Sequence, residues 1–272
     1  MSAITSTFHE LRRKNEAALI GYVMAGDPSP KHTCQLVDAL RSGGVDIVEL
    51  GIPFSDPIAD GPILQRAAQR ALTSGTTPKK VFEIARAIKR RDEVPLVVMT
   101  YYNIIYRMGI QLFCRAAERN GVNGVIVPDM PVEESEQFTQ VAAAHNLDTI
   151  FLAAPCTSEE RLVRVADAST GFLYLVSANA VTGMRETVHN ESIAFIKRAV
   201  SIVRESVPLA VGFGLSQPSH VQRVVECGAH GVIVGSRFAK TIEENLGDAK
   251  KMLKALNQRA LMLKRSTLPT TH

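Results

Sequence analysis

The sequence predicts an α/β fold, a (β/α)8 TIM barrel with an extra N-terminal helix, folded as a single domain over residues 1–272. Eight short apolar runs rich in β-branched residues alternate with amphipathic stretches, a pattern typical of parallel strands joined by helices. A helix-ending glycine followed shortly by a strand recurs at Gly44, Gly121 and Gly228, as a repeated β/α unit would give. The length of 272 residues also fits, because such barrels reach about 250 residues as one domain.

The expected strands lie in residues 18–26, 46–53, 95–103, 124–129, 149–155, 172–179, 208–214 and 231–236. Helical periodicity follows in residues 31–41, 79–91, 111–119, 132–145, 159–168, 192–204, 219–227 and 249–263. An open doubly wound sheet is the alternative, but it usually has fewer strands and a GxGxxG turn, where this chain has Gly26-Asp27-Pro28. A short helix around Phe8 should cover the bottom of the barrel, with Thr7 and Glu10 spaced as a capping box.

Composition excludes several classes of protein. Apolar residues make up 46% and charged residues 21%, as in ordinary globular domains. The four cysteines are scattered without a CxxC pair and the histidines lack metal-ligand spacing, so we expect no metal site and no disulfides, and interpret the cysteines as small core residues. The net charge of +4 is concentrated in residues 250–265, which indicates a solvated helix face rather than a nucleic-acid site. With no signal-like start and no long apolar run, we expect a soluble cytoplasmic protein.

Glu49 is the candidate catalytic group that the strand pattern selects. Active sites of such barrels lie at the carboxyl ends of the strands. Alternation in the second run places Val48, Leu50 and Ile52 toward the helices and Glu49 toward the barrel interior. Because no expected strand contains Lys or Arg, desolvation should raise the pKa of Glu49 and suit it to both donating and accepting protons. The alternative is a structural glutamate hydrogen-bonded to nearby tyrosines.

The loop of residues 53–62 follows Glu49 and contains three prolines and two acids. Asp56 precedes a proline and could initiate a turn, whereas Asp60 precedes Gly-Pro, where the loop bends back toward the barrel mouth. Asp60 is therefore the second candidate carboxylate, with turn formation as the equal alternative.

Five aromatic residues lie in or just after the expected strands: Tyr22, Tyr101, Tyr102, Tyr174 and Phe213. Together they suggest a pocket for a flat apolar ring, although any one of them alone is more commonly a core residue.

Glycines follow the last two strands, where barrels of this type often bind phosphate. Gly212 and Gly214 end the seventh run, and Gly235 and Ser236 end the eighth, before a short helix that would direct its positive end at an anion. Glycine also ends strands for steric reasons alone. The polar stretch of residues 179–190, with Gly183, has the length of a mobile lid.

These residues carry a resemblance to a known family. Residues 49–62, Glu-Leu-Gly-Ile-Pro-Phe-Ser-Asp-Pro-Ile-Ala-Asp-Gly-Pro, resemble the ELG(I/V)PFSDP(x)ADGP signature of tryptophan synthase alpha chains. The resemblance continues through residues 26–28, 127–134, 181–183 and 212–214 to Gly235-Ser236, so it spans nearly the whole chain. It implies a carbon–carbon lyase of aromatic amino acid biosynthesis that cleaves indole-3-glycerol phosphate by a retro-aldol reaction.

The resemblance also implies roles for individual residues. Glu49 would be the principal acid–base group and Asp60 would stabilise positive charge at the indole N–H. The implied substrate pocket contains Tyr22, Leu64, Tyr101, Tyr174, Thr182, Phe213 and Ile233. The implied phosphate site contains Gly183, Gly214, Gly235 and Ser236. The family works with a beta chain in an α2β2 complex, and the implied contacts with it are Pro53, Asp56, Pro57, Asn103 and Pro131.

By the same resemblance this chain needs no cofactor, because pyridoxal phosphate belongs to the beta chain, and Thr182 contacts Asp60 when the lid closes. The sequence departs from the family at Ala178-Asn179-Ala180, where well-known members have an arginine and a glycine. That departure concerns lid closure rather than the carboxylates.

Three other functions are considered. A free-standing indole-3-glycerol phosphate lyase is possible within the family. A sugar-phosphate or anthranilate-type isomerase would place a lysine or cysteine acid–base group on a strand, and no expected strand has a lysine. A non-catalytic barrel that activates a partner would require a damaged carboxylate pair, whereas both acids are present.

Overall fold

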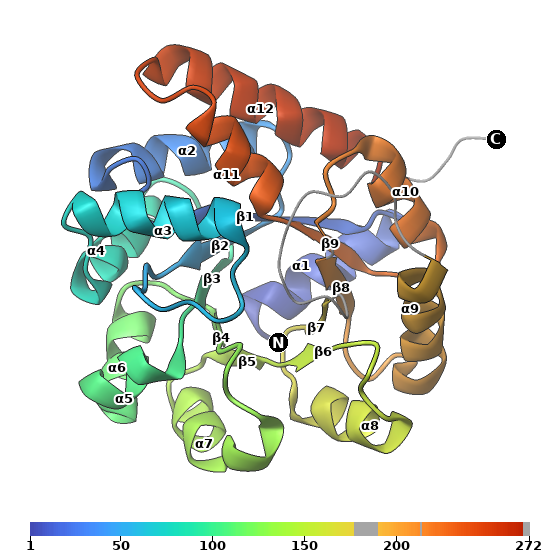
Figure 1. The fold of residues 1–272 in the computed structure, drawn as a ribbon. Coiled ribbons are helices and arrows are strands. Elements are labelled where there is room, and N and C mark those ends of the chain that lie inside the picture. The colour runs from blue at the N-terminus through green and yellow to red at the C-terminus, as the bar shows by residue number, and fades with distance from the viewer. Residues whose placement is uncertain (177–189, 213, 269–272) are drawn as a thin grey trace.

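The computed structural model describes residues 1–176, 190–212 and 214–268, and it confirms the predicted barrel (Figure 1). Parallel strands surround the axis and helices form an outer ring. The strands are β1 (Ala18–Met24), β2 (Ile47–Gly51), β3 (Leu96–Met99), β4 (Gly124–Ile126), β5 (Asp148–Ile150), β6 (Leu152–Ala153), β7 (Leu173–Val176), β8 (Leu209–Gly212) and β9 (Gly231–Val234). Their order in the sheet is β5-β4-β3-β2-β1-β9-β8-β7-β6. Since β5 and β6 are the two halves of the fifth run, interrupted only at Phe151, the two ends of the sheet meet there and the barrel closes.

The helices largely follow the predicted pattern. They are α1 (Ala3–Arg13), α2 (Pro30–Ser42), α3 (Pro62–Thr73), α4 (Pro78–Lys89), α5 (Tyr102–Met108), α6 (Ile110–Arg119), α7 (Glu136–Ala144), α8 (Glu159–Ala168), α9 (Asn190–Val203), α10 (Pro218–Glu226), α11 (Ser236–Glu243) and α12 (Ala249–Arg265). Gly44, Gly121 and Gly228 have φ of +93°, +80° and +95°, so the recurring glycine after a helix is needed for its left-handed backbone.

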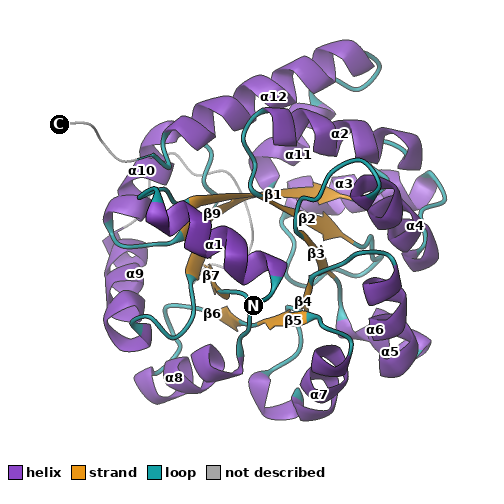
Figure 2. Ribbon diagram, turned by 180° about the vertical axis from the view of Figure 1, so that it is seen from behind, coloured by secondary structure: helices purple, strands orange, loops and turns teal. Residues whose placement is uncertain are grey.

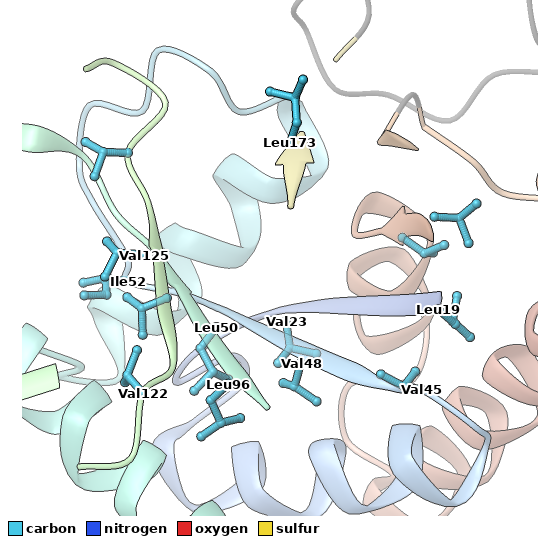
Figure 3. Close-up of a cluster of buried hydrophobic side chains, with 14 of the residues drawn as sticks. Leu19, Val23, Val45, Val48, Leu50, Ile52, Leu96, Val122, Val125 and Leu173 are labelled. Atoms are coloured by element: carbon cyan, nitrogen blue, oxygen red, sulfur yellow. The ribbon is translucent and has the colours of Figure 1, made fainter. Parts of the chain in front are cut away.

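Buried side chains form two layers, one on each face of the strands. The outer layer lies between strands and helices, and its members include Val48, Leu50 and Leu96 (Figure 3). The inner layer fills the lower barrel with Ile20, Ile47, Val97, Ile126, Ile150, Phe172, Ala210 and Ile233. Helix α1 lies across the lower opening (Figure 2) and adds Ile4, Phe8 and Leu11 to that layer. The predicted plug is therefore confirmed.

The capping prediction for that plug is wrong. Helix α1 begins at Ala3 with Ser2 as its N-cap, and the Ser2 Oγ accepts from the Thr5 N–H. Thr7 lies inside the helix and its hydroxyl donates to the Ala3 carbonyl at 3.0 Å. The Thr-x-x-Glu spacing matched a capping box by chance, because a true cap needs a residue with extended backbone, as Ser2 has.

Other expectations also need correction. Helices α3 and α5 are absent from the predicted pattern. Helix α3 follows the proline-rich loop, and α5 begins within the last two residues assigned to the third strand, Tyr102 and Asn103. The stretch 132–145 begins as a 3-10 turn, Val132–Glu134, before α7. Cys114 is buried, but Cys156 is exposed, so not all cysteines belong to the core. No helix in the described part of the chain is long and apolar enough to cross a membrane.

Candidate active site

Glu49 lies on β2 inside the barrel, one layer above Ile47, where strand alternation predicts it. It is 1% exposed, and in the register of the sheet it is flanked by Tyr22 of β1 and Val97 of β3. Burial raises the pKa of Glu49 from 4.5 to about 8, and the nearby charge of Asp60 adds to the rise. Glu49 Oε2 is buried and has no hydrogen-bond partner within the described residues. The structural alternative, a glutamate tied to tyrosines, gains no support at this atom.

Asp60 stands at the mouth of the barrel, directly before α3. It is 5% exposed, and burial raises the pKa of its carboxyl from 3.8 to about 6, while a hydrogen bond with Tyr101 acts in the opposite direction. The Tyr101 hydroxyl also accepts from the Ala59 N–H at 3.1 Å, and its ring stacks on Phe54 with centroids 5.3 Å apart. The Asp60 carbonyl accepts from Gln65 Nε2 at 2.8 Å. These bonds give Asp60 a defined position, which a simple turn residue would not need.

Three tyrosines surround the two carboxylates. Tyr22 is buried and Tyr174 is half-buried near both acids. Desolvation together with those acids raises the pKa of each phenol. Burial followed by the charge of Asp60 raises the pKa of Tyr101 as well. All three phenols therefore stay protonated at neutral pH and present neutral hydroxyls and ring faces. Tyr102 does not join them, because it packs on the outer layer and on Tyr106.

Two glycines make room for the phenol groups. A Cβ at Gly51 would lie 2.2 Å from the Tyr22 hydroxyl oxygen, and one at Gly212 would lie 2.5 Å from that of Tyr174. Any larger residue at either position would push a ring out of the site. From the sequence, Gly212 is expected only at a strand end near a phosphate site, and Gly51 has no expected role. The space that the two glycines leave for the tyrosine rings becomes apparent only when neighbouring strands are placed side by side.

Apolar residues complete the described wall. Leu64 is 5% exposed and packs in one cluster with Tyr22 and Met24. Ile233 is buried in the inner layer, against which Tyr174 packs. The site thus has aromatic and aliphatic sides with two acids between them, a combination that fits a flat ring bearing an N–H group.

The expected phosphate residues converge at the same end of the barrel. Gly214 has φ of +69°, a left-handed backbone that favours glycine. Gly235 is the N-cap of α11 and Ser236 is its first residue, with Ser236 buried. The first N–H groups of a helix have no partner inside it and carry its partial positive charge, so the start of α11 is suited to an anion. The predicted residues Thr182, Gly183 and Phe213, and the variant segment 178–180, lie outside the described residues.

The residues expected to contact a partner lie on the loops and helices above the strands. Asp56, Asn103 and Pro131 are exposed and Pro57 is half-buried. Pro53 is buried within this chain. Asp129, which lies in the 127–134 stretch, caps α5 by accepting from the Tyr102 N–H at 2.9 Å, and thereby fixes the helix that carries Asn103.

Fold and site together define a parallel α/β barrel with a buried carboxylate pair, an aromatic wall and a helix terminus suited to phosphate. The family model for the tryptophan synthase alpha chain matches residues 8–267. A tryptophan synthase alpha chain from Methanoregula boonei is 44% identical over 266 residues, 98% of each chain, and one from Methanosarcina mazei is 47% identical over 253 residues, covering 93% of this chain and 91% of that one. The chain therefore belongs to the tryptophan synthase alpha chain family, and its role lies in tryptophan biosynthesis.

Solved structures agree with this assignment. The tryptophan synthase complex from Pyrococcus furiosus is matched with a TM-score of 0.84 and 40% identity, over 91% of this chain and 98% of that one. The alpha chain from Legionella pneumophila is matched with a TM-score of 0.89 and 33% identity, over 98% of this chain and 97% of that one.

Proposed function

We propose that this chain is a lyase that cleaves indole-3-glycerol phosphate into indole and glyceraldehyde 3-phosphate. The observation that carries the proposal is the pair of buried carboxylates with separated pKa values, about 8 for Glu49 and about 6 for Asp60. Near neutral pH one group is mostly protonated and the other mostly ionised. Neighbouring acids held in opposite states are the usual arrangement for an acid and a base in one site.

Glu49 is assigned the proton transfers. Its carboxyl gives a proton to C3 of the indole ring, which turns the ring into an electron sink. The resulting carboxylate then accepts the proton of the hydroxyl on the carbon attached to C3. The electron pair of the broken carbon–carbon bond returns to the ring, the hydroxyl carbon becomes the aldehyde, and Glu49 ends protonated as it began. An acid with a pKa near the working pH can perform both transfers.

Asp60 is assigned to the charge that this protonation creates. Once C3 is protonated, positive charge develops at the ring nitrogen, and an ionised carboxylate beside the N–H stabilises it. The hydrogen bond from Tyr101 favours the ionised form of Asp60. Leu64, Tyr22 and Tyr174 would contact the flat ring, while Gly214, Gly235 and Ser236 would hold the phosphate at the start of α11.

The proposal extends to the assembly. The structures solved from Pyrococcus furiosus include the tryptophan synthase α2β2 complex, which this chain matches at 39% identity and a TM-score of 0.84. We expect this chain to bind a beta chain through the exposed loops and helices that carry Asp56, Asn103 and Pro131. We expect it to need no cofactor itself, with pyridoxal phosphate held by the beta chain. The biosynthetic role fits a cytoplasmic location.

The reaction is tested by measuring indole and glyceraldehyde 3-phosphate released from indole-3-glycerol phosphate. The wild type should form both in equal amounts, and Glu49→Gln should lower kcat by about 10²- to 10⁴-fold, the usual contribution of general acid–base catalysis. Ile47→Val is the matched control, because it changes the same strand one layer lower. A Glu49→Gln protein with wild-type turnover would contradict the proposed mechanism.

The same assay with an added beta chain separates an assembly from a free-standing lyase. Size-exclusion chromatography of the mixture should show a complex, and turnover should rise when it forms. Full turnover by the isolated chain with no complex formation would favour the free-standing lyase instead.

A further inference from the structure

Outside the carboxylate pair, one side chain joins three separate segments of the barrel. Arg70 of α3 donates to both carboxylate oxygens of Asp27, from Nε at 2.7 Å and from Nη2 at 2.9 Å. Its Nη1 donates to Glu243 Oε1 at 2.8 Å. Asp27 follows β1 and Glu243 ends α11, so Arg70 ties the loop after β1, helix α3 and helix α11 together.

These ion pairs differ from ordinary surface pairs. The Asp27 side chain is 1% exposed, and those of Arg70 and Glu243 are 21% and 24% exposed. A two-pronged contact between a guanidinium and a carboxylate fixes direction as well as distance, and it is stronger when water is excluded. Arg66 also pairs with Glu243, at 2.7 Å, but its side chain is 53% exposed and contributes less.

Helix α3 needs such a fixed contact because its buried face is smooth. That face consists of Leu64, Ala67, Ala68 and Ala71, which pack in a cluster with Tyr22 and Ala239. Alanine methyl groups form low ridges, so they hold α3 against β1 and α11 without setting how far it slides along its axis. Figure 1 shows α3 and α11 side by side. The Arg70 contact with Glu243 joins these two helices.

The three joined segments each carry one part of the site. Tyr22 lies on β1, which leads to Asp27. Asp60 directly precedes Gly61, the N-cap of α3, and its carbonyl is bonded to Gln65 of that helix, so Asp60 moves with α3. Gly235 and Ser236 form the start of α11, at the opposite end from Glu243.

We propose that Arg70 is a positioning residue that sets the distance between Asp60 and the phosphate-binding start of α11. This inference rests on the proposed function, since it concerns where the indole and phosphate ends of one substrate are held. An error of about 1 Å in the distance between two subsites lowers the affinity for a ligand that spans both. The affinity for a ligand bound by one subsite alone is unchanged.

The test compares one linked ligand with its two halves. The linked ligand is 3-(indol-3-yl)propyl phosphate, which carries a ring and a phosphate and cannot be cleaved, and the halves are indole and inorganic phosphate. Dissociation constants are measured by calorimetry or NMR titration for the wild type and for Arg70→Gln. The variant should bind the linked ligand about 10- to 100-fold more weakly and each half within about twofold of the wild type. Its kcat/KM should fall with the affinity for the linked ligand.

Arg41→Gln is the matched control. Arg41 is 32% exposed and forms an ion pair with Asp92 at 3.0 Å, but it joins no segment of the site. Its removal should cost less stability than that of Arg70, because Asp92 is not buried, and should leave all three dissociation constants unchanged.

Arg70→Gln leaves the buried Asp27 carboxylate without its partner, which can cost several kcal/mol of stability. If that variant does not fold, the double variant Asp27→Asn with Arg70→Gln removes the unpaired charge while still breaking the link. Unchanged binding of the linked ligand by either folded variant overturns the inference, as does equal weakening of the linked ligand and both halves. A wild type that binds the linked ligand no better than its halves overturns the proposed function itself.

Discussion

Ile47 and Glu49 lie on the same strand, point into the same barrel and are both buried, yet the layers to which they belong have opposite chemistry. The lower layer is apolar and closed by Phe8 and its neighbours from α1. The upper layer holds two carboxylates and three phenols beneath loops. One strand pattern therefore serves two purposes: the lower layer stabilises the barrel, and the upper layer gives up stability to keep acids out of water.

The pH dependence of stability gives the largest expected difference between the layers. The pKa of Glu49 is raised from 4.5 to about 8 by folding, so the folded chain keeps a proton that the unfolded chain loses between those values. The stabilising effect of that proton is fully present below about pH 4.5 and is lost as pH rises through about 8. Glu49→Gln should therefore gain stability relative to wild type with rising pH, by at most about 5 kcal/mol at about pH 9, measured by urea unfolding.

Ile47→Val is the control for this comparison. It should lose about 1 kcal/mol at every pH, because no charge is involved. A difference between Glu49→Gln and wild type that does not change with pH would show that Glu49 titrates normally.

Removing a large side chain from the lower layer should lower the free energy of unfolding without changing activity. Phe8 is 4% exposed, and its ring lies 5.8 Å from that of Phe172 between centroids. Phe8→Ala should lower the free energy of unfolding by about 4 kcal/mol through the cavity it leaves. The kcat measured below the unfolding transition should stay within about twofold of wild type, since α1 covers the end of the barrel opposite the carboxylates. A parallel loss of kcat in fully folded protein would contradict the division between layers.

Removing one hydroxyl from the upper layer should give the smallest effect. Tyr101→Phe deletes the hydrogen bond that lowers the pKa of Asp60, so that pKa should rise above about 6. The acidic limb of the kcat/KM profile should then move upward by about 1 pH unit, with little change at about pH 8. Tyr106→Phe, at a side chain that is 74% exposed, is the control and should move nothing.

The difference between the layers also explains what the sequence could predict. Alternation along one strand was enough to place Ile47 and Glu49 inside and Val48 outside, because period two is a local rule. The absence of Lys and Arg from the expected strands pointed correctly to a raised pKa for Glu49. The burial of Asp60 could not be derived in this way, since it depends on Tyr101 and on a helix, α3, that the pattern did not predict.

Contacts between segments far apart in the sequence could not be predicted for the same reason. Arg70 meets Asp27 across 43 positions and Glu243 across 173, and nothing in the local pattern of α3 marks it. The space for the tyrosine rings at Gly51 and Gly212 likewise appears only when neighbouring strands are in register. The false capping box at Thr7 is the converse case, in which a local pattern matched without the backbone geometry that gives it meaning.

The protonation of Glu49 is the claim on which the mechanism most depends, and carbon-13 NMR measures it directly. Protein labelled at the glutamate side-chain carboxyl carbon is titrated from about pH 4 to about pH 10, and the Glu49 signal is assigned by its loss in Glu49→Gln. The signal should titrate with a midpoint near 8, well above the ordinary glutamate value of 4.5. A Glu49 midpoint near 4.5 would mean that the carboxyl is ionised at neutral pH, and would contradict its assignment as the proton donor.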